Sequence, residues 1–179
     1  MKNKMLDFLK RLLRKKPRVF LTSDLHLDHK NIIRYCNRPF KNVHEMNYWL
    51  IKNWNKTVRK QDIVYFLGDF ALTRGNRQRV IRFIHSLNGK KIFIRGNHDK
   101  LLKSYHHFIL KYKSKFFYLV HHPSDIPHNW EGWAIFGHTH NKGLFIDRKR
   151  KRINVSTEQT KYKPISINKI VNLIHKNDI

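Results

Sequence analysis

Cysteine, acidic residues and long apolar runs are scarce in this sequence. The single cysteine, Cys36, excludes an internal disulfide and any CxxC metal site, so histidine and carboxylate side chains would have to bind a metal. No run of about 18 apolar residues is present, which excludes a transmembrane helix. Because the first residues also lack the apolar core and the small-residue cleavage site of a secretion signal, we expect a cytoplasmic protein.

The shortage of acidic residues makes the chain strongly basic. It has 38 Lys and Arg against 12 Asp and Glu, which gives a formal net charge of +26 at pH 7. Such a charge favours binding of polyanions, and nucleic acid is the first candidate partner. A chain that is rich in Lys, Asn and Ile throughout, through a coding bias, explains the same charge without a polyanionic partner.

The 179 residues, of which 40% are hydrophobic, predict one globular domain preceded by a basic amphipathic helix. Residues 2–16 place five apolar side chains on one helical stripe among lysines and arginines, and Pro17 ends the helix. We therefore divide the chain into an N-terminal helix at 1–17 and a domain at 18–179. We expect the helix to dock on the domain, with docking on a partner or on an anionic membrane surface as the alternatives.

Strand-like and helix-like segments alternate after Pro17 and then give way to a run of strands. Strands are expected at residues 18–24, 62–69, 90–99, 108–113, 115–122, 132–138, 143–147 and 152–156. Helices are expected at residues 30–36, 43–58, 77–87, 100–104 and 167–176. Alternating units followed by consecutive strands predict a layered α/β sandwich with its sheets in the middle.

Polar side chains follow five of these strands where each one ends. The segments are DLH at 24–26, GD at 68–69, GNHD at 96–99, HHP at 121–123 and GHTH at 137–140. Ligands gather at the carboxyl ends of strands in α/β folds, and divalent metals take imidazole nitrogen, carboxylate oxygen and amide oxygen. Two ions about 3.5–4 Å apart need a bridging carboxylate, for which Asp69 is the natural candidate. The pattern therefore predicts a dinuclear metal site.

The spacing within two of these segments supports a shared site. Asp24 with His26, and His138 with His140, lie one residue apart on what we take to be strand continuations, so each pair points to one side. Glycines lie beside the expected ligands and are expected to let the backbone turn sharply and approach the site closely. These glycines are Gly68, Gly96 and Gly137.

The five segments, in this order, resemble the signature blocks of the calcineurin-like metallophosphoesterase superfamily. Longer segments resemble a small bacterial and phage-type branch of it: 22–40, 45–55, 62–72 and 154–167. The resemblance implies a four-layer αββα sandwich with two central mixed β-sheets. It also implies a metal-dependent phosphoric ester hydrolase with two divalent metal ions, for which we expect Mn²⁺, with Fe²⁺, Zn²⁺ or Ni²⁺ as alternatives.

The resemblance implies seven metal ligands and one catalytic histidine. The first metal is assigned Asp24, His26 and His140, the second Asn97, His121 and His138, and the bridge is Asp69. In the implied mechanism, a hydroxide activated by the metals attacks phosphorus in line while His98 assists departure of the leaving oxygen.

The residues alone leave His121 and His122 as alternative ligands. The family pattern places the ligand before one residue and a proline, which favours His121. Asp99 directly precedes an expected helix and is predicted to be its N-cap.

Two further residues are candidate substrate contacts. His29 follows Asp28, where family members usually have glycine. Arg74 resembles the phosphate-binding arginine of phosphoprotein phosphatases, although the spacing is one residue longer.

We predict a phosphodiesterase that acts on a nucleotide or a nucleic acid. Residues 147–152, DRKRKR, are expected to form a hairpin tip near the ligand loops, within reach of a nucleic-acid backbone. The alternatives are a phosphomonoesterase and a catalytically silent metal-binding scaffold. Histidines outside the five segments are expected to be ordinary surface or core residues: His85, His106, His107, His128 and His175.

Overall fold

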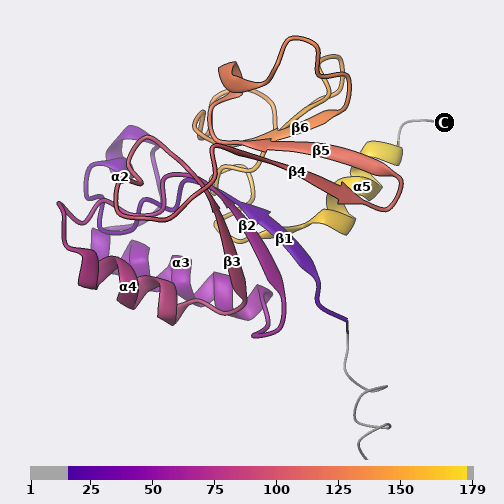
Figure 1. The fold of residues 1–179 in the computed structure, drawn as a ribbon. Helices are drawn as coiled ribbons and strands as arrows, with labels where there is room; N and C mark the ends of the chain where they lie inside the picture. Colours follow the sequence, from indigo (N-terminus) through magenta and orange to yellow (C-terminus); the bar gives the residue numbers. More distant parts are fainter. Residues whose placement is uncertain (1–15, 177–179) are drawn as a thin grey trace, which may run out of the picture.

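The computed structural model describes residues 16–176, and in it two β-sheets face each other across a shared core (Figure 1). The first sheet has the order β3 (Lys90–Ile94), β2 (Ile63–Leu67), β1 (Val19–Thr22) and β9 (Ile165–Ser166). The second has the order β4 (His107–Tyr112), β5 (Lys115–Val120), β6 (Trp133–Phe136), β8 (Arg152–Asn154) and β7 (Ile146–Asp147). Each sheet has three parallel strands and at least one antiparallel edge strand.

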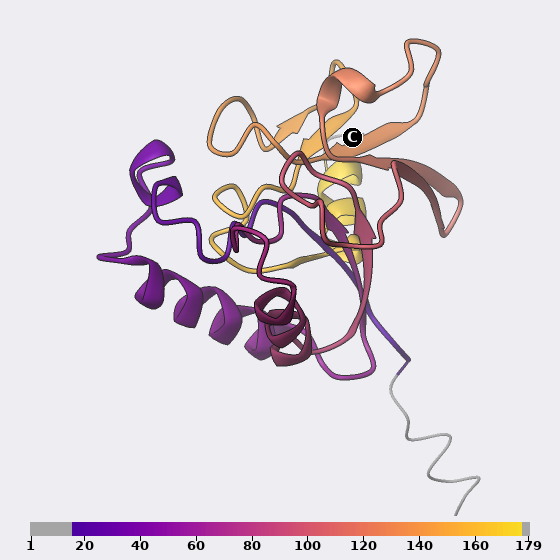
Figure 2. The ribbon, with the colours of Figure 1, turned by 60° about the vertical axis from the view of Figure 1, so that its left-hand side comes forward.

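Two helices cover the outer face of the first sheet, α3 (Val43–Thr57) and α4 (Arg77–Ser86) (Figures 1 and 2). The α3 residues Met46, Leu50 and Trp54 are four apart and form a single buried stripe. An asparagine side chain caps each helix, because Asn42 and Asn76 each accept a hydrogen bond from the backbone N–H three residues on.

The core between the sheets is formed by alternate residues of the strands. In β2, Tyr65 and Leu67 face the second sheet, whereas Val64 and Phe66 face the helices. The buried side of α5 (Ile167–His175) packs into this inter-sheet core (Figure 2). The outer face of the second sheet is covered by the segment around the short 3₁₀ helix η1 (Pro123–Asp125). The outer face of the first sheet is therefore covered by two α-helices, whereas that of the second sheet is covered by a loop segment with one short 3₁₀ helix.

The predicted fold class, an α/β sandwich with two central mixed sheets, is confirmed. The eight predicted strands are present, with bounds at most five residues from the expected ones, and α2 (Ile32–Tyr35) lies within the expected helix at 30–36. Strand β9 was not predicted, since two residues carry no periodic signal. The predicted helix at 100–104 is wrong: this segment forms a turn.

The predicted N-terminal helix lies outside the described residues, apart from its last residue, so the division of the chain at residue 17 stays a prediction. Within residues 16–176, no helix is long and apolar enough to cross a membrane. The cytoplasmic location also stays a prediction.

Residues 147–152 form the predicted hairpin between β7 and β8, but the expected position near the ligand loops is wrong. Lys151 accepts a hydrogen bond from Ala134 N at the start of β6, and its Nζ donates to Glu131 O. The guanidinium of Arg148 donates to the carbonyl oxygen of Ile174 in the last turn of α5. The tip lies at the start of β6, whereas the predicted ligands His138 and His140 follow its end, about 13 Å away for four residues at 3.3 Å each.

Candidate metal centre

The backbone at the expected ligands adopts left-handed turns where we expected strand continuations. Five of the seven have a positive φ: Asp24 (58°), His26 (50°), Asp69 (60°), His138 (67°) and His140 (52°). The expectation that residues one apart share a side because a strand continues is therefore wrong. The side chains converge because the chain turns after each strand. Such conformations cost about 1–3 kcal/mol each and persist where surrounding contacts hold them, commonly at ligand-binding sites.

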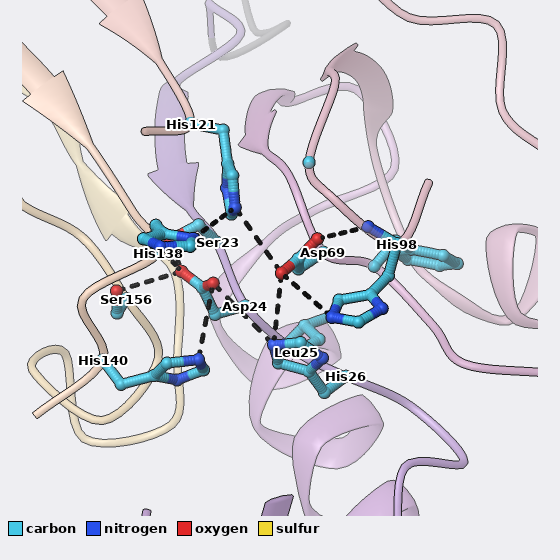
Figure 3. A network of polar contacts seen from close by, with 12 residues as sticks. Ser23, Asp24, Leu25, His26, Asp69, His98, His121, His138, His140 and Ser156 are labelled. Atoms are coloured by element: carbon cyan, nitrogen blue, oxygen red, sulfur yellow. Dashed lines mark hydrogen bonds and ion pairs between the residues drawn. The ribbon is translucent and has the colours of Figure 1, made fainter. Parts of the chain in front are cut away.

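Asp24 is completely buried, and its two carboxylate oxygens differ in their contacts (Figure 3). Oδ2 accepts hydrogen bonds from Ser23 Oγ at 2.5 Å, from Ser156 Oγ at 2.9 Å and from the backbone N–H of His138 at 2.9 Å. Oδ1 has no hydrogen-bond partner within residues 16–176. The protein thus holds Asp24 by one oxygen and leaves the other available.

The second oxygen of Asp24 faces two imidazoles. Asp24 Oδ1 lies 3.9 Å from His26 Nε2 and 3.8 Å from His140 Nε2. One ligand atom from each of these three residues lies within 4.8 Å of the other two. The structure therefore brings together the three residues assigned to the first metal.

Asp69 lies between His26 of this group and His121 of a second group (Figure 3). Its Oδ2 is 3.5 Å from His26 Nε2 and 3.5 Å from His121 Nε2, while its Oδ1 accepts a hydrogen bond from His98 N at 2.9 Å. Asp69, His121 and His138 form a second group whose ligand atoms lie within 4.8 Å of one another. One carboxylate thus reaches imidazoles of both groups.

Hydrogen bonds behind the histidines orient their rings. His121 Nδ1 lies 2.7 Å from Leu67 O, and His140 Nδ1 lies 3.1 Å from Glu158 Oε1. When Nδ1 carries the proton and donates it to these acceptors, Nε2 of each ring has a lone pair toward the carboxylates. The ring orientation is therefore the one that a metal-binding imidazole needs.

A buried arginine connects Glu158 to the loop that carries Asp24. Arg38 Nη2 lies 2.7 Å from Glu158 Oε1 and also donates to Asp24 O at 2.7 Å, and Nη1 donates to Leu25 O at 2.8 Å. Neither Arg38 nor Glu158 was singled out from the sequence. Their only signal was their place in the segments 22–40 and 154–167 that carry the family resemblance.

Burial and neighbouring charges shift the protonation of these groups in opposite directions. Burial raises the pKa of Asp24, although His121 and His140 oppose this, and burial lowers the pKa of His26 well below its usual value. Burial alone would also raise the pKa of Asp69, but the hydrogen bond and charge of His121 hold that pKa far below its usual value. Asp69 is therefore a carboxylate at neutral pH.

The pKa values of the other three histidines are also shifted in opposite directions. Burial lowers the pKa of His138 to about 4, with the positive charge of His121 adding to the effect. For His121, burial is outweighed by the hydrogen bond to Asp69 and by the charge of Asp24, which raise its pKa to about 9. For His140, burial is outweighed by hydrogen bonds to Cys36 and Glu158, which raise its pKa to about 10. The carboxylates thus attract positive charge, which a proton or a cation can supply.

The residues fit a divalent cation. Within the described part of the chain, Asp24 Oδ1 and both ring nitrogens of His26 are buried without a hydrogen-bond partner. A buried polar atom left in this state costs about 1–3 kcal/mol unless a ligand satisfies it. Carboxylate oxygen and imidazole nitrogen are the donors that Mn²⁺, Fe²⁺ and Zn²⁺ accept.

Asp99 joins two of the ligand loops and does not cap a helix, so this prediction is wrong. Its carboxylate accepts hydrogen bonds from the backbone N–H groups of Asp69, Phe70 and Gly96. The carboxylate points back into the interior, which leaves the segment after it without an N-cap. A Cβ on Gly96 would overlap with the backbone nitrogen of Asp69, so only glycine allows this close approach.

The remaining predicted residues lie around the two groups. Asn97 is exposed in the turn after β3, and with His121 it lines a cavity of about 710 Å³. The side chain of His98 is 42% exposed, and its Nε2 lies 4.0 Å from Asp69 Oδ2. Arg74 lines a cavity of about 400 Å³ together with Asn97 and His98. The catalytic, metal-binding and substrate-binding roles of these residues stay predictions.

His29 and His122 also take defined places. The ring of His29 lies 5.4 Å from that of His26 and 6.1 Å from that of His98, between centroids. His122 caps η1, because its Nδ1 accepts a hydrogen bond from Ser124 N at 3.1 Å. Of the two alternatives after β5, His121 is thus the histidine that faces Asp69.

Asp28 holds the first loop against the helices. Its carboxylate contacts the guanidinium of Arg79 in α4 and accepts a hydrogen bond from Asn47 Nδ2 at 2.7 Å. The residue has a φ of 63°, a conformation that the glycine usual in the family adopts without strain. The side-chain contacts of Asp28 therefore hold the loop in a conformation that glycine would adopt without them.

The chain belongs to the calcineurin-like phosphoesterase family, whose model matches residues 17–176. Membership supports a metal-dependent phosphoric ester hydrolase, and the His and Asp groups described above are its candidate metal ligands.

Known relatives of the chain come from an archaeon, a phage and a bacterium. The uncharacterized protein MJ1445 of Methanocaldococcus jannaschii is 48% identical over 167 residues, which cover 90% of this chain and 94% of that protein. The Gene 66 protein of Mycobacterium phage L5 is 36% identical over 81 residues, 45% of this chain and 39% of that protein. The crystal structure of a protein of unknown function from Aquifex aeolicus superposes with a TM-score of 0.71 at 28% identity, covering 89% of this chain and all of that chain.

Proposed function

We propose that the protein is a dinuclear-metal phosphodiesterase that hydrolyses a nucleotide or nucleic-acid phosphodiester. The observation that carries the proposal is the position of Asp69, whose Oδ2 lies 3.5 Å from an imidazole nitrogen of each group, His26 Nε2 and His121 Nε2. A carboxylate in this position suits the bridge between two metal ions.

The two groups would each hold one cation. Asp24, His26 and His140 are assigned to the first, and Asn97, His121 and His138 to the second, with Mn²⁺ as the proposed metal. When bound, such a pair supplies Lewis-acid activation of water and neutralises the charge that develops on the phosphoryl group. Two dications and two aspartates sum to +4 − 2 = +2, which attracts an anionic phosphate.

The protein residues position the substrate and move a proton. The backbone N–H of His98 donates to Asp69 Oδ1 and thereby holds its own imidazole beside the carboxylate that would bridge the metals. Because that imidazole is 42% exposed, its ring can meet a phosphoester at the rim and donate a proton to the departing oxygen. His29, next to His98, and Arg74 are proposed to contact the phosphate oxygens.

Two cavities beside the centre favour a diester over a monoester. The cavity of about 710 Å³ and the cavity of about 400 Å³ share Asn97 in their walls. A phosphodiester has an organic group on each side of phosphorus, and the two cavities offer a place for each. The net charge of +26 supports a nucleotide or nucleic-acid substrate.

The test is turnover of bis-p-nitrophenyl phosphate against p-nitrophenyl phosphate with added Mn²⁺. We expect a higher kcat/KM for the diester, no turnover above background for Asp69→Asn, and a kcat lower by about 10²–10⁴ for His98→Ala. His128→Ala is the matched control, because His128 is an exposed histidine that belongs to neither ligand group and lines neither cavity.

Two results would contradict the phosphodiesterase and favour one of the alternative functions. A higher kcat/KM for the monoester would indicate a phosphomonoesterase. No turnover of either ester with Mn²⁺, Fe²⁺, Zn²⁺ or Ni²⁺ would indicate a catalytically silent metal-binding scaffold.

A further inference from the structure

The larger cavity beside the metal centre has walls that the proposed reaction does not use. It encloses about 710 Å³, within the range of about 300–1,000 Å³ that is usual for small-ligand pockets. His121 and Asn97 form the side toward the centre. The remaining wall includes Arg95, Lys100, His106, His107, Tyr118 and Asp125.

Two of these residues carry positive charges that form no ion pair in the part of the chain that the structure describes. Arg95 and Lys100 flank the GNHD segment, both are exposed, and neither has an ion-pair partner within residues 16–176. Other arginines take up acidic side chains instead, as in the pairs between Arg18 and Asp62 and between Arg38 and Glu158. The cavity wall therefore offers two cations to an incoming anion.

The two acidic residues in the wall, Asp99 and Asp125, form no ion pair with Arg95 or Lys100, so both cations can bind an anionic ligand. Asp99 is 5% exposed, and its oxygens accept hydrogen bonds from three backbone N–H groups of the ligand loops. Asp125 is exposed, and its Oδ1 accepts a hydrogen bond from Ser124 Oγ at 3.1 Å. A ligand here meets cations for a phosphate and one acceptor for a hydroxyl or amino group.

A planar surface completes the wall. The ring of His107 stacks on Tyr118, with centroids 5.0 Å apart and an interplanar angle of 13°, and Tyr118 in turn packs against Trp130. His107 is exposed, while Tyr118 is buried beneath it. Aromatic rings held in this way are the surfaces on which unpaired nucleic-acid bases stack.

We propose that this cavity is a nucleotide subsite for the unit next to the scissile phosphate of a single strand. The adjacent phosphate binds Arg95 and Lys100, and the base lies against His107. Asp125 accepts a hydrogen bond from a donor of the base or sugar. The inference rests on the proposed phosphodiesterase function and narrows its substrate to a strand with at least two phosphates.

The direct test is binding of a fluorescently labelled pentathymidylate to the full-length protein, measured by anisotropy in EDTA so that no hydrolysis occurs. The double variant Arg95→Ala/Lys100→Ala is compared with Lys149→Ala/Arg150→Ala at the β7–β8 hairpin tip, which removes the same charges at the opposite end of the sheet. We expect the first variant to bind about tenfold or more weakly and the control to stay within about twofold. The slope of log K against log salt should fall by about 0.7 for each phosphate contact removed.

A third variant tests the contact with the base separately from the contacts with the phosphate. His107→Ala should weaken binding of the pentathymidylate and leave inhibition of that binding by inorganic tripolyphosphate unchanged. Equal losses in the two double variants would show a general charge effect and overturn the subsite. Unchanged pentathymidylate binding by His107→Ala would overturn the stacking contact.

A kinetic comparison separates this inference from the proposed function. With Mn²⁺, the loss in kcat/KM of Arg95→Ala/Lys100→Ala should be about tenfold greater for the oligonucleotide than for bis-p-nitrophenyl phosphate, which has one phosphate. Equal losses on both substrates would place these residues at the scissile phosphate and overturn the subsite. If the wild type turns over neither substrate, the proposed function fails, while the binding experiment still decides the subsite.

Discussion

Replacing Glu158 tests whether the contacts behind the candidate metal centre contribute to the stability of the protein and to the proposed Mn²⁺ binding. Glu158 Oε1 lies 2.7 Å from Arg38 Nη2 and 3.1 Å from His140 Nδ1. The side chains of Arg38 and Glu158 are 0% and 4% exposed. Glu158→Ala therefore leaves a buried guanidinium without its counter-charge, and it leaves the imidazole of His140, a proposed metal ligand, without its acceptor.

The size of both effects follows from these contacts. Removing one partner of a buried ion pair costs about 3–5 kcal/mol. Arg38 keeps its hydrogen bonds to Asp24 O and Leu25 O, so we expect a loss of about 3 kcal/mol in the free energy of unfolding. For a chain of this length that lowers Tm by about 6–12 °C. Loss of the acceptor behind His140 should weaken Mn²⁺ binding by about 10–100-fold.

The assays are urea unfolding of the metal-free protein and calorimetric titration with Mn²⁺. Glu158→Gln keeps an acceptor oxygen and the side-chain volume, so it should lie between the wild type and Glu158→Ala in both assays. Glu131→Ala, which changes an exposed glutamate before β6, should match the wild type. A loss below about 1 kcal/mol for Glu158→Ala, or unchanged Mn²⁺ affinity in a folded variant, would refute the reasoning.

Two pH dependences follow from the shifted pKa values. Because the pKa of His121 is raised to about 9 and that of His140 to about 10, both carry protons at neutral pH that a metal must displace. Apparent Mn²⁺ affinity should therefore rise between pH 6.5 and 8.5, by up to about tenfold per pH unit for each proton released. Calorimetry in buffers of different ionisation enthalpy counts those protons, and a flat profile contradicts the assignment. Burial would raise the pKa of Asp62, but hydrogen bonds from Arg18 and Arg59 lower it to about 2. A lowered folded pKa stabilises the protein above about pH 4 and loses this effect as pH falls toward 2. Urea unfolding at pH 5 and pH 3 should therefore show a smaller drop for Asp62→Asn than for the wild type, and equal drops would count against the contact.

Local sequence patterns predicted most of the secondary structure, and together with the family resemblance they predicted the residues of the candidate site. The i, i+4, i+8 stripe of Met46, Leu50 and Trp54 specifies a helix with one buried face whatever the rest of the chain does. The segments with Asp24 and Asp69 follow two neighbouring parallel strands of one sheet, so their approach could be expected. His121 follows β5 of the second sheet, and only the packing of the two sheets brings it to Asp69.

The failures are residues whose surroundings come from distant parts of the chain. Asp99 precedes a segment that suits a helix, yet its carboxylate binds backbone groups 29 and 30 residues away, and the helix does not form. The contact between Arg38 and Glu158 joins residues 120 positions apart, which no local pattern shows. The basic hairpin tip was misplaced because spacing along the chain does not tell which end of a strand a loop occupies.

The sequence by itself determined which side chains are available to bind metal and which strands deliver them, because residue type and short-range periodicity are local properties. Only the tertiary structure decided how these side chains meet. The left-handed turns at Asp24 and His140 are strained conformations that isolated segments would not keep. Hydrogen bonds from distant residues hold them, from Ser156 to Asp24 and from Asn154 to His140. The cavity beside the centre likewise exists only because the turn after β3 folds against β5, which brings Lys100 and Tyr118 into one wall.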